Sequence, residues 1–197
     1  KGLDVMLDRM NLKWQTVSGN DMAPFLNAIN PISGKHTANA ASAKVEWAQL
    51  PFYKNIALVR VNDSSWGSEI GPFWFLAKQG QMFHLDGTSA PIHDANEAGP
   101  ISVTEENVIN YLRFFCFFVH GDEGPFYVVE DLEKSALDQA KMDDTTRQVV
   151  EGSIVDAAFE GKDDKGQLIA SAIVLYGDAL FSARFALTTD GMIEMTD

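Results

Sequence analysis

The sequence is poor in cysteine and in basic residues, and it has no long apolar run. Cys116 is the single cysteine among 197 residues, so the chain cannot form an intramolecular disulfide and needs no oxidising compartment. This favours a cytoplasmic location, while a secreted or periplasmic location stays compatible with a leader that was removed. No apolar run reaches the roughly 18–20 residues that span a bilayer, so we expect no membrane partner and no membrane segment.

Basic residues are outnumbered by acidic ones. The 15 Lys and Arg side chains stand against 28 Asp and Glu, which gives a formal net charge of −13. The lysines do not cluster, since Lys162 and Lys165 stand beside Asp163 and Asp164. A phosphate backbone would be repelled by this charge, so we expect no nucleic-acid partner. A solvated acidic surface that keeps the protein in solution explains the balance without any partner.

What the sequence does contain is typical of a globular protein. Hydrophobic residues make up 46% of the chain and aromatic residues 11%. The length favours one domain over 1–197. A subdivision into an irregular strand region, 1–99, and a helix with an antiparallel sheet, 100–197, is the alternative.

The N-terminal half predicts short elements between turn-forming residues. We expect a short helix over 1–10 and, over 18–43, a loop with one helical turn, because Asn, Ser, Gly and Pro are frequent there. Alternating apolar residues predict additional N-terminal strands, of which the last two form a hairpin. These strands are expected at 12–17, 44–48, 56–61, 73–77 and 81–85.

The clearest local signal is a Phe-rich helix from Thr104 to Gly121. Thr104 is expected to cap the first turn, and Gly121 to end the helix in a left-handed conformation. From Phe114 to Val119 no side of the helix is polar. This half must therefore be covered by the sheet, by loops or by a second subunit.

The C-terminal part predicts an antiparallel meander. We expect a strand at 126–130, an acidic helix at 131–144 for which a mobile loop is the alternative, long strands at 147–160, 167–176 and 179–189, and a short one at 192–195. The fold class is then α+β, with a buried central helix packed against a C-terminal antiparallel meander and additional N-terminal strands. By analogy of shape alone, this is the arrangement of cystatin-like, cone-shaped folds.

Two segments of the middle third carry a resemblance. They are Leu85-Asp86-Gly87-Thr88-Ser89-Ala90-Pro91-Ile92-His93 and Tyr111-Leu112-Arg113-Phe114-Phe115-Cys116-Phe117-Phe118-Val119. Together they resemble an uncharacterised family of bacterial proteins. The resemblance implies a bacterial origin, and because the family has no assigned activity it implies no catalytic or binding residue.

The densest group of potentially reactive side chains consists of His84, Asp86, His93 and Asp94. Two imidazoles and two carboxylates could supply a general base oriented by an acid, or a metal site made of His84, Asp86 and His93. The structural alternative is a turn at Asp86-Gly87 with polar side chains that cap local backbone groups, and the sequence favours it.

A second pair, Cys116 and His120, is spaced as neighbours on one helical face, where an imidazole could lower the pKa of a thiol. The phenylalanines around Cys116 instead favour an inert core cysteine, with His120 at the helix end.

Two classes of function follow. The first is a non-catalytic module, monomer or homodimer, that binds a small apolar ligand or a protein through the concave face of the sheet or the Phe-rich surface. The second is a small enzyme with a pocket at the sheet mouth, in which His84 or His93 acts as a base with Asp86 or Asp94. We expect no cofactor. The first class is favoured because no constellation of residues matches a known catalytic motif.

Overall fold

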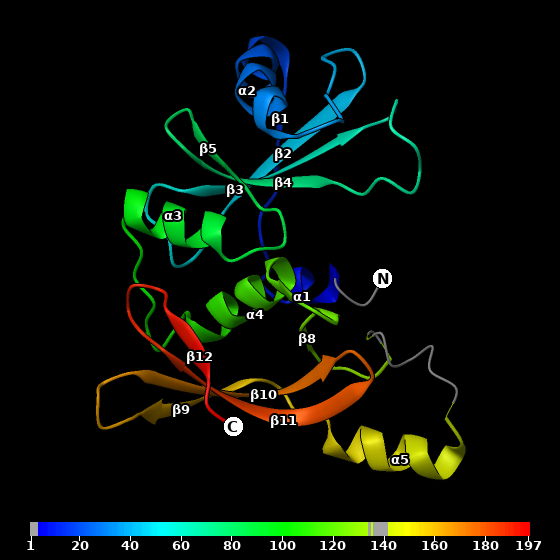
Figure 1. Ribbon diagram of the computed structural model, residues 1–197, viewed down its shortest axis with the longest axis vertical. Helices are drawn as coiled ribbons and strands as arrows, with labels where there is room; N and C mark the ends of the chain where they lie inside the picture. The colour runs from blue at the N-terminus through cyan, green and yellow to red at the C-terminus, as the bar shows by residue number, and fades with distance from the viewer. Residues whose placement is uncertain (1–3, 134, 136–141) are drawn as a thin grey trace. The chain divides into compact units, whose positions relative to one another are not determined.

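The computed structural model describes residues 4–133, 135 and 142–197, and its fold is mixed α+β with antiparallel strand pairing. The chain divides into two compact units (Figure 1). Unit 1 combines Lys1–Asn11 with Ser102–Asp197, and unit 2 is the continuous segment Leu12–Ile101. The subdivision expected at 99/100 lies two residues from the boundary at 101/102. The single domain over 1–197 stays a prediction.

Unit 2 is built on a five-stranded meander in the order β1-β2-β3-β4-β5. The strands are β1 (Gln15–Val17), β2 (Ala43–Gln49), β3 (Ala57–Asp63), β4 (Phe73–Lys78) and β5 (Gln81–His84). Its helices are η1 (Gly19–Asp21), α2 (Met22–Ile29), η2 (Asn30–Ile32) and α3 (Ala90–Ala98).

The helices of unit 2 correct the sequence prediction. The segment 18–43 holds α2 and two short 3-10 turns instead of a loop with one turn, because Leu26 and Ile29 bury one face of α2. Helix α3 was not predicted. Pro91 stands in its first turn, where a proline costs no hydrogen bond, and Ile92 and Ala95 are fully buried.

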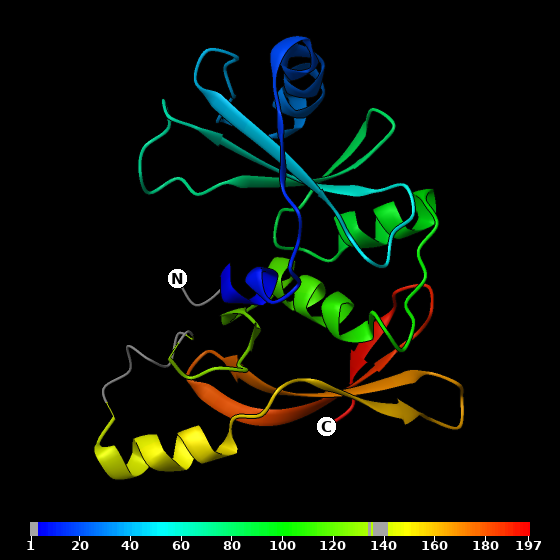
Figure 2. The same ribbon diagram turned by 180° about the vertical axis from the view of Figure 1, so that it is seen from behind.

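Both faces of the unit 2 sheet are covered. The strand register aligns Val17, Val45, Val61 and Phe73 in one row across β1 to β4, on the face whose core includes residues of α2. Alternate residues such as Leu58 point to the opposite face, and helices α2 and α3 lie on opposite sides of the sheet (Figures 1 and 2). Strands β2, β3 and β4 therefore bury side chains in both directions.

Unit 1 holds the second large sheet, in the order β12-β11-β10-β8 with β9 also paired to β10. Its strands are β6 (His120–Gly121), β7 (Gly124–Pro125), β8 (Tyr127–Val128), β9 (Ala158–Lys162), β10 (Leu168–Tyr176), β11 (Ala179–Leu187) and β12 (Ile193–Met195). Its helices are α1 (Asp4–Asp8), α4 (Val108–Phe118) and α5 (Asp144–Ser153).

Helix α4 is shorter than predicted at both ends. The Asn107 side-chain oxygen accepts a hydrogen bond from the Thr104 backbone N–H at 2.7 Å. Thr104 was expected to accept a hydrogen bond through its hydroxyl, but here it donates one through its backbone. At the other end Gly121 pairs with Gly124 in a short hairpin instead of ending the helix. A Cβ at Gly121 would lie 2.4 Å from the Tyr176 hydroxyl oxygen, so close packing requires this glycine.

The apolar half of α4 is covered within the chain. Phe114, Phe117 and Phe118 are buried, and Phe115 is half-buried. Phe118 meets Phe114 and Phe117 edge-to-face, with ring centroids 5.2 and 4.7 Å apart. In Figure 1, α4 crosses one face of the unit 1 sheet with α1 beside it. Phe114 and Phe117 are therefore buried without a second subunit, and the choice between monomer and homodimer stays a prediction.

The strand expected at 147–160 is wrong. This segment forms α5 followed by β9. The reason lies at Asp143, whose carboxylate accepts the Thr146 backbone N–H at 2.7 Å and caps a helix at this point. Of the helix predicted over 131–144, residues 134 and 136–141 lie outside the described part of the chain.

Candidate functional site

His84, the first of the sequence candidates, lies among aromatic rings. The register of β4 and β5 places it directly opposite Phe75, and its imidazole stacks on that ring with centroids 5.0 Å apart and planes inclined by 26°. The Phe73 ring lies 6.0 Å away. Because Phe73 and Phe75 alternate with Trp74 along β4, both rings point to the same face as His84.

Two further rings extend this arrangement. Trp66 packs against Phe73 with centroids 4.7 Å apart, and His36 meets Phe73 at 5.9 Å and Trp66 at 6.2 Å. We call the set His36, Trp66, Phe73, Phe75 and His84 the aromatic cluster. Within the cluster Phe75 is fully buried, whereas the other four rings are half-buried. The cluster thus presents ring surface to solvent, with an imidazole on either side of Phe73.

The loops that carry Trp66 and His36 are held by Asp63, at the end of β3. The Asp63 carboxylate accepts backbone N–H groups from Asn39 at 2.7 Å and Ser65 at 2.8 Å. Burial would raise the pKa of Asp63, but these hydrogen bonds and those from serine hydroxyls outweigh it and hold the pKa far below its usual value. The Trp66 indole N–H also donates to the Thr37 carbonyl at 3.1 Å. Trp66 is therefore fixed from two sides.

Asp86, the second candidate, serves a local turn. One of its carboxylate oxygens accepts the Thr88 backbone N–H at 3.0 Å and the Thr88 hydroxyl at 2.7 Å. Partial burial would raise the pKa of Asp86, but these hydrogen bonds, aided by the charge of His84, hold the pKa below its usual value. This matches the expected turn at Asp86-Gly87.

The remaining candidates, His93 and Asp94, lie on α3. His93 is half-buried and Asp94 is exposed. Helix α3 covers the face of the sheet opposite to the one that carries His84, so the structure does not join the two histidines on one surface (Figure 1). Within residues 4–133, 135 and 142–197, no three His, Cys, Asp or Glu side chains form a group that could hold a metal ion.

The pair Cys116 and His120 is also separated. His120 lies outside α4, in β6, and is exposed, whereas Cys116 is buried. Burial raises the pKa of the Cys116 thiol to about 12, which leaves it protonated near neutral pH. The interpretation of Cys116 as an inert core residue is confirmed, and the placement of His120 on the helix is wrong.

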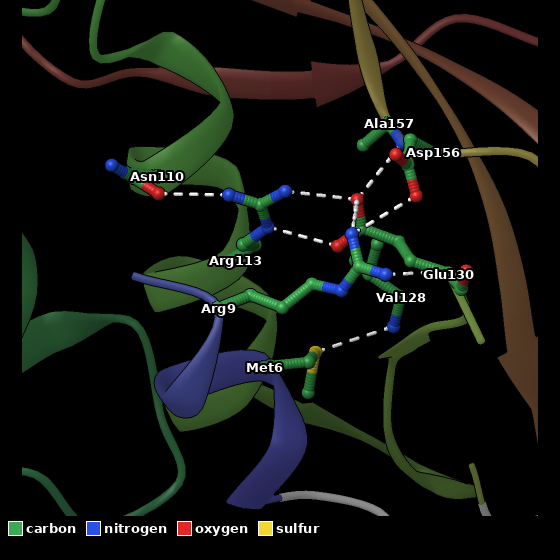
Figure 3. A network of polar contacts seen from close by, with 8 residues as sticks. All are labelled: Met6, Arg9, Asn110, Arg113, Val128, Glu130, Asp156 and Ala157. Carbon is green, nitrogen blue, oxygen red and sulfur yellow. Dashed lines mark hydrogen bonds and ion pairs between the residues drawn. The ribbon is translucent and has the colours of Figure 1, made fainter. Parts of the chain in front are cut away.

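Unit 1 contains a network of buried charges that the sequence did not indicate (Figure 3). Arg113 on α4 donates to both carboxylate oxygens of Glu130, at 2.8 and 2.9 Å, and the side chain of Glu130 is only 3% exposed. The Ala157 N–H donates to the same carboxylate at 3.0 Å, and Arg9 bonds to Asp156 at 2.9 Å. An Arg9–Glu130 ion pair at 3.6 Å completes the network, which joins four segments of the chain. Because these contacts saturate Glu130 within the chain, the network offers no binding site.

Sequence reasoning thus found one residue of the aromatic cluster and missed its neighbours. The alternation of Phe73 and Phe75 was a usable signal, since residues two apart on a strand share a face. Trp66 and His36 carried none, because they stand in loops whose positions depend on long-range hydrogen bonds.

No helix in the described part of the chain is long and apolar enough to cross a membrane. Comparisons of the sequence with protein-family models, with curated proteins and with solved structures found no match. This is consistent with a resemblance to a family without an assigned activity, and the bacterial origin stays a prediction.

Proposed function

We propose that this protein is a non-catalytic binding module whose aromatic cluster binds a small, planar, largely apolar ligand. The observation that carries the proposal is that four linked rings, two on one face of the sheet and two in adjacent loops, are only partly buried; they are His36, Trp66, Phe73 and His84. A flat ligand can stack on such rings, and each aromatic pair contributes about 0.5–1.5 kcal/mol beyond the area it buries.

The imidazoles add direction to this surface. His36 and His84 each place two ring nitrogens next to apolar rings, and neutral imidazole offers one hydrogen-bond donor and one acceptor. A ligand with one polar group at its edge would then be oriented, in the way that small-molecule sites combine an apolar lining with few polar groups.

Unit 1 combines a helix with an antiparallel sheet. Helix α4 across an antiparallel sheet is the arrangement that the cystatin-like, cone-shaped analogy describes, and we propose that analogy for unit 1 alone. The Phe-rich surface and the concave face of this sheet are weak candidates for ligand binding, because Phe114 and Phe117 are buried. Binding is therefore assigned to unit 2.

The test uses the full chain and 2-naphthol as a planar, largely apolar probe. Two-dimensional NMR resolves one indole N–H signal for each of the four tryptophans. We expect the Trp66 signal to shift with increasing 2-naphthol, and the signal of Trp74, which points to the opposite face of β4, to stay in place.

Variants locate the site. Phe73→Ala should weaken 2-naphthol binding at least fivefold. Phe83→Ala is the matched control, because Phe83 is a half-buried ring of β5 that pairs with Leu76 and faces the other side of the sheet. Equal loss in both variants, or a shift of all four indole signals alike, would refute a site at the aromatic cluster.

The same assay separates binding from catalysis by histidine. His84→Ala should weaken 2-naphthol binding, whereas His93→Ala should leave it unchanged, because His93 lies on α3. An enzyme that uses both histidines requires both substitutions to impair one activity, and the opposite positions of the two residues give no support for that.

A further inference from the structure

Helix α5 lacks the burial that holds the other long helices in place. Among its ten residues, all of them described, none is buried. Val149 is 69% exposed, and Val155, just beyond the helix, is 59% exposed. Figures 1 and 2 both show α5 projecting at the margin of unit 1. A helix of this length gains most of its stability by packing an apolar face, so α5 is unpartnered.

The exposed row of α5 consists of small side chains, of which Val149 is apolar. Thr145, Val149 and Ser153 follow one another at four-residue spacing and are all exposed, so they form one stripe along the helix. Arg147 and Val150 are half-buried and lie on the side towards the rest of unit 1. The stripe therefore points away from the rest of unit 1, and Val155 is a second exposed valine just beyond the helix.

Negative charge surrounds this stripe. Asp144 and Glu151 stand on the helix, and Asp143 and Asp156 flank its two ends, all four exposed. Arg147 is the single cation of the helix. A second copy that docked through the same stripe would bring these carboxylates together, and like charges at an interface oppose association. The surface therefore disfavours a homodimer and favours a partner of opposite charge.

We propose that α5 and Val155 dock a basic protein partner, which places an apolar side chain on Val149 and Val155 and pairs Lys or Arg with Asp144 and Glu151. The apolar contact would supply the packing that α5 lacks, and the charges would speed encounter and select the partner. This surface is separate from the aromatic cluster of unit 2, so the two proposals stand or fall independently.

The test uses two synthetic helical peptides as probes for the full-length protein. The first contains only Leu and Lys in an amphipathic pattern, and the second has every Lys replaced by Glu. We expect the Leu/Lys peptide to bind and to slow amide hydrogen exchange across 143–156, and the Leu/Glu peptide to do neither. Raising the salt from 50 to 500 mM should weaken the Leu/Lys complex at least tenfold.

Three double variants localise the interaction. Val149→Ser with Val155→Ser should reduce affinity for the Leu/Lys peptide at least tenfold, and Asp144→Asn with Glu151→Gln should reduce it and flatten its salt dependence. Met192→Ser with Met195→Ser is the matched control, because these exposed apolar side chains, 54% and 39% exposed, also belong to unit 1. It should leave affinity unchanged.

Three results would overturn the proposal. Equal binding by the Val149/Val155 variant would show that charge alone attracts the peptide. Protection of other segments instead of 143–156 would place the surface elsewhere. Sedimentation equilibrium that finds a dimer, lost in the Val149/Val155 variant, would make a second copy the occupant of the stripe.

Discussion

Units 1 and 2 each build an antiparallel sheet with a helix on it, but they present different chemistry to solvent. Unit 1 carries 21 acidic and nine basic side chains, whereas unit 2 carries seven acidic and six basic ones. All four tryptophans and three of the four histidines belong to unit 2. Nearly the whole net charge of −13 is thus confined to one unit, and the indole rings to the other.

The net charge of the whole chain is therefore a property of unit 1 and does not describe the surface of unit 2. The excess of negative charge belongs to unit 1, while unit 2 is close to neutral and leaves aromatic rings partly exposed. Recognition by stacking fits unit 2, and recognition by charge fits unit 1.

The largest effect is expected at the core of unit 1. Phe114→Ala should lower the free energy of unfolding by about 3–5 kcal/mol, because the ring is fully buried and its loss leaves a cavity. The measurement is the urea midpoint followed by circular dichroism. Phe115→Ala, one position along the same helix, is the control and should cost less, since Phe115 is half-buried.

The same variant examines whether the units unfold together. Tryptophan fluorescence reports unit 2 alone, because all four indoles lie there. A single domain over 1–197 requires the fluorescence midpoint of Phe114→Ala to fall with the circular dichroism midpoint. A fluorescence midpoint equal to that of the unsubstituted protein would show two independent domains and would sharpen the comparison.

The next effect concerns the buried charges of unit 1. Glu130→Ala removes the carboxylate between Arg9 and Arg113, and breaking a buried pair costs about 3–5 kcal/mol. We expect a loss at the lower end of this range, because Arg9 is 32% exposed and its guanidinium can be hydrated once the carboxylate is removed. Asp156→Ala breaks only the exposed side of the network and should cost about 0–1 kcal/mol. Similar losses for both would mean that Glu130 is not a buried anchor.

A smaller effect is expected in unit 2. Asp63→Asn should cost about 1–3 kcal/mol near neutral pH, because the amide satisfies the surrounding N–H groups less well than the carboxylate. The folded-state pKa of Asp63 is depressed, so its contribution is present above the unfolded pKa of about 4 and is lost as pH falls through the folded value.

The direction of this pKa shift provides a control for the substitution. Stability of the unsubstituted protein should fall with pH below about 4 more steeply than that of Asp63→Asn. Trp66 fluorescence should change in the variant even where the fold persists, because Asp63 holds the loop that carries Trp66. If the stability of Asp63→Asn falls below about pH 4 as steeply as that of the unsubstituted protein, the role of Asp63 is contradicted.

The smallest effect is that of salt. Added NaCl screens repulsion among exposed carboxylates, so we expect unit 1 to gain up to about 1 kcal/mol between 50 and 500 mM salt, and unit 2 to gain less. Circular dichroism and tryptophan fluorescence separate the two in urea titrations. An equal gain by both probes would refute the confinement of charge effects to unit 1.

Single strands could be predicted from the alternation of apolar and polar residues in the sequence. The strand predicted at 44–48 spans Ala43–Gln49, and that at 179–189 spans Ala179–Leu187. Such strands bury alternate side chains, so local periodicity carries the information. Helix α3 was missed because Ala90-Pro91 follows a turn, and α5 was taken for a strand because two β-branched valines stand within it.

The candidate site was predicted less well than the fold. His84 was found because histidine is rare, but its grouping with Asp86, His93 and Asp94 followed proximity in sequence. The structure groups it with Phe75 through strand register and with His36 through loops anchored at Asp63. Register and long-range hydrogen bonds depend on the assembled sheet, so no local pattern could have revealed them.

The insertion of unit 2 within unit 1 has a consequence for the order of events during synthesis. Helix α1 is synthesised before unit 2, whereas its packing partner α4 follows only after the about 90 residues of unit 2. While unit 2 is unfolded, joining α1 to α4 closes a loop that costs about 4 kcal/mol in chain entropy. A folded unit is more compact than its unfolded chain, so folding of unit 2 shortens that loop. Helix α1 is therefore synthesised early and packs late, and the Arg9–Glu130 ion pair can form only after α4 and Glu130 have been synthesised.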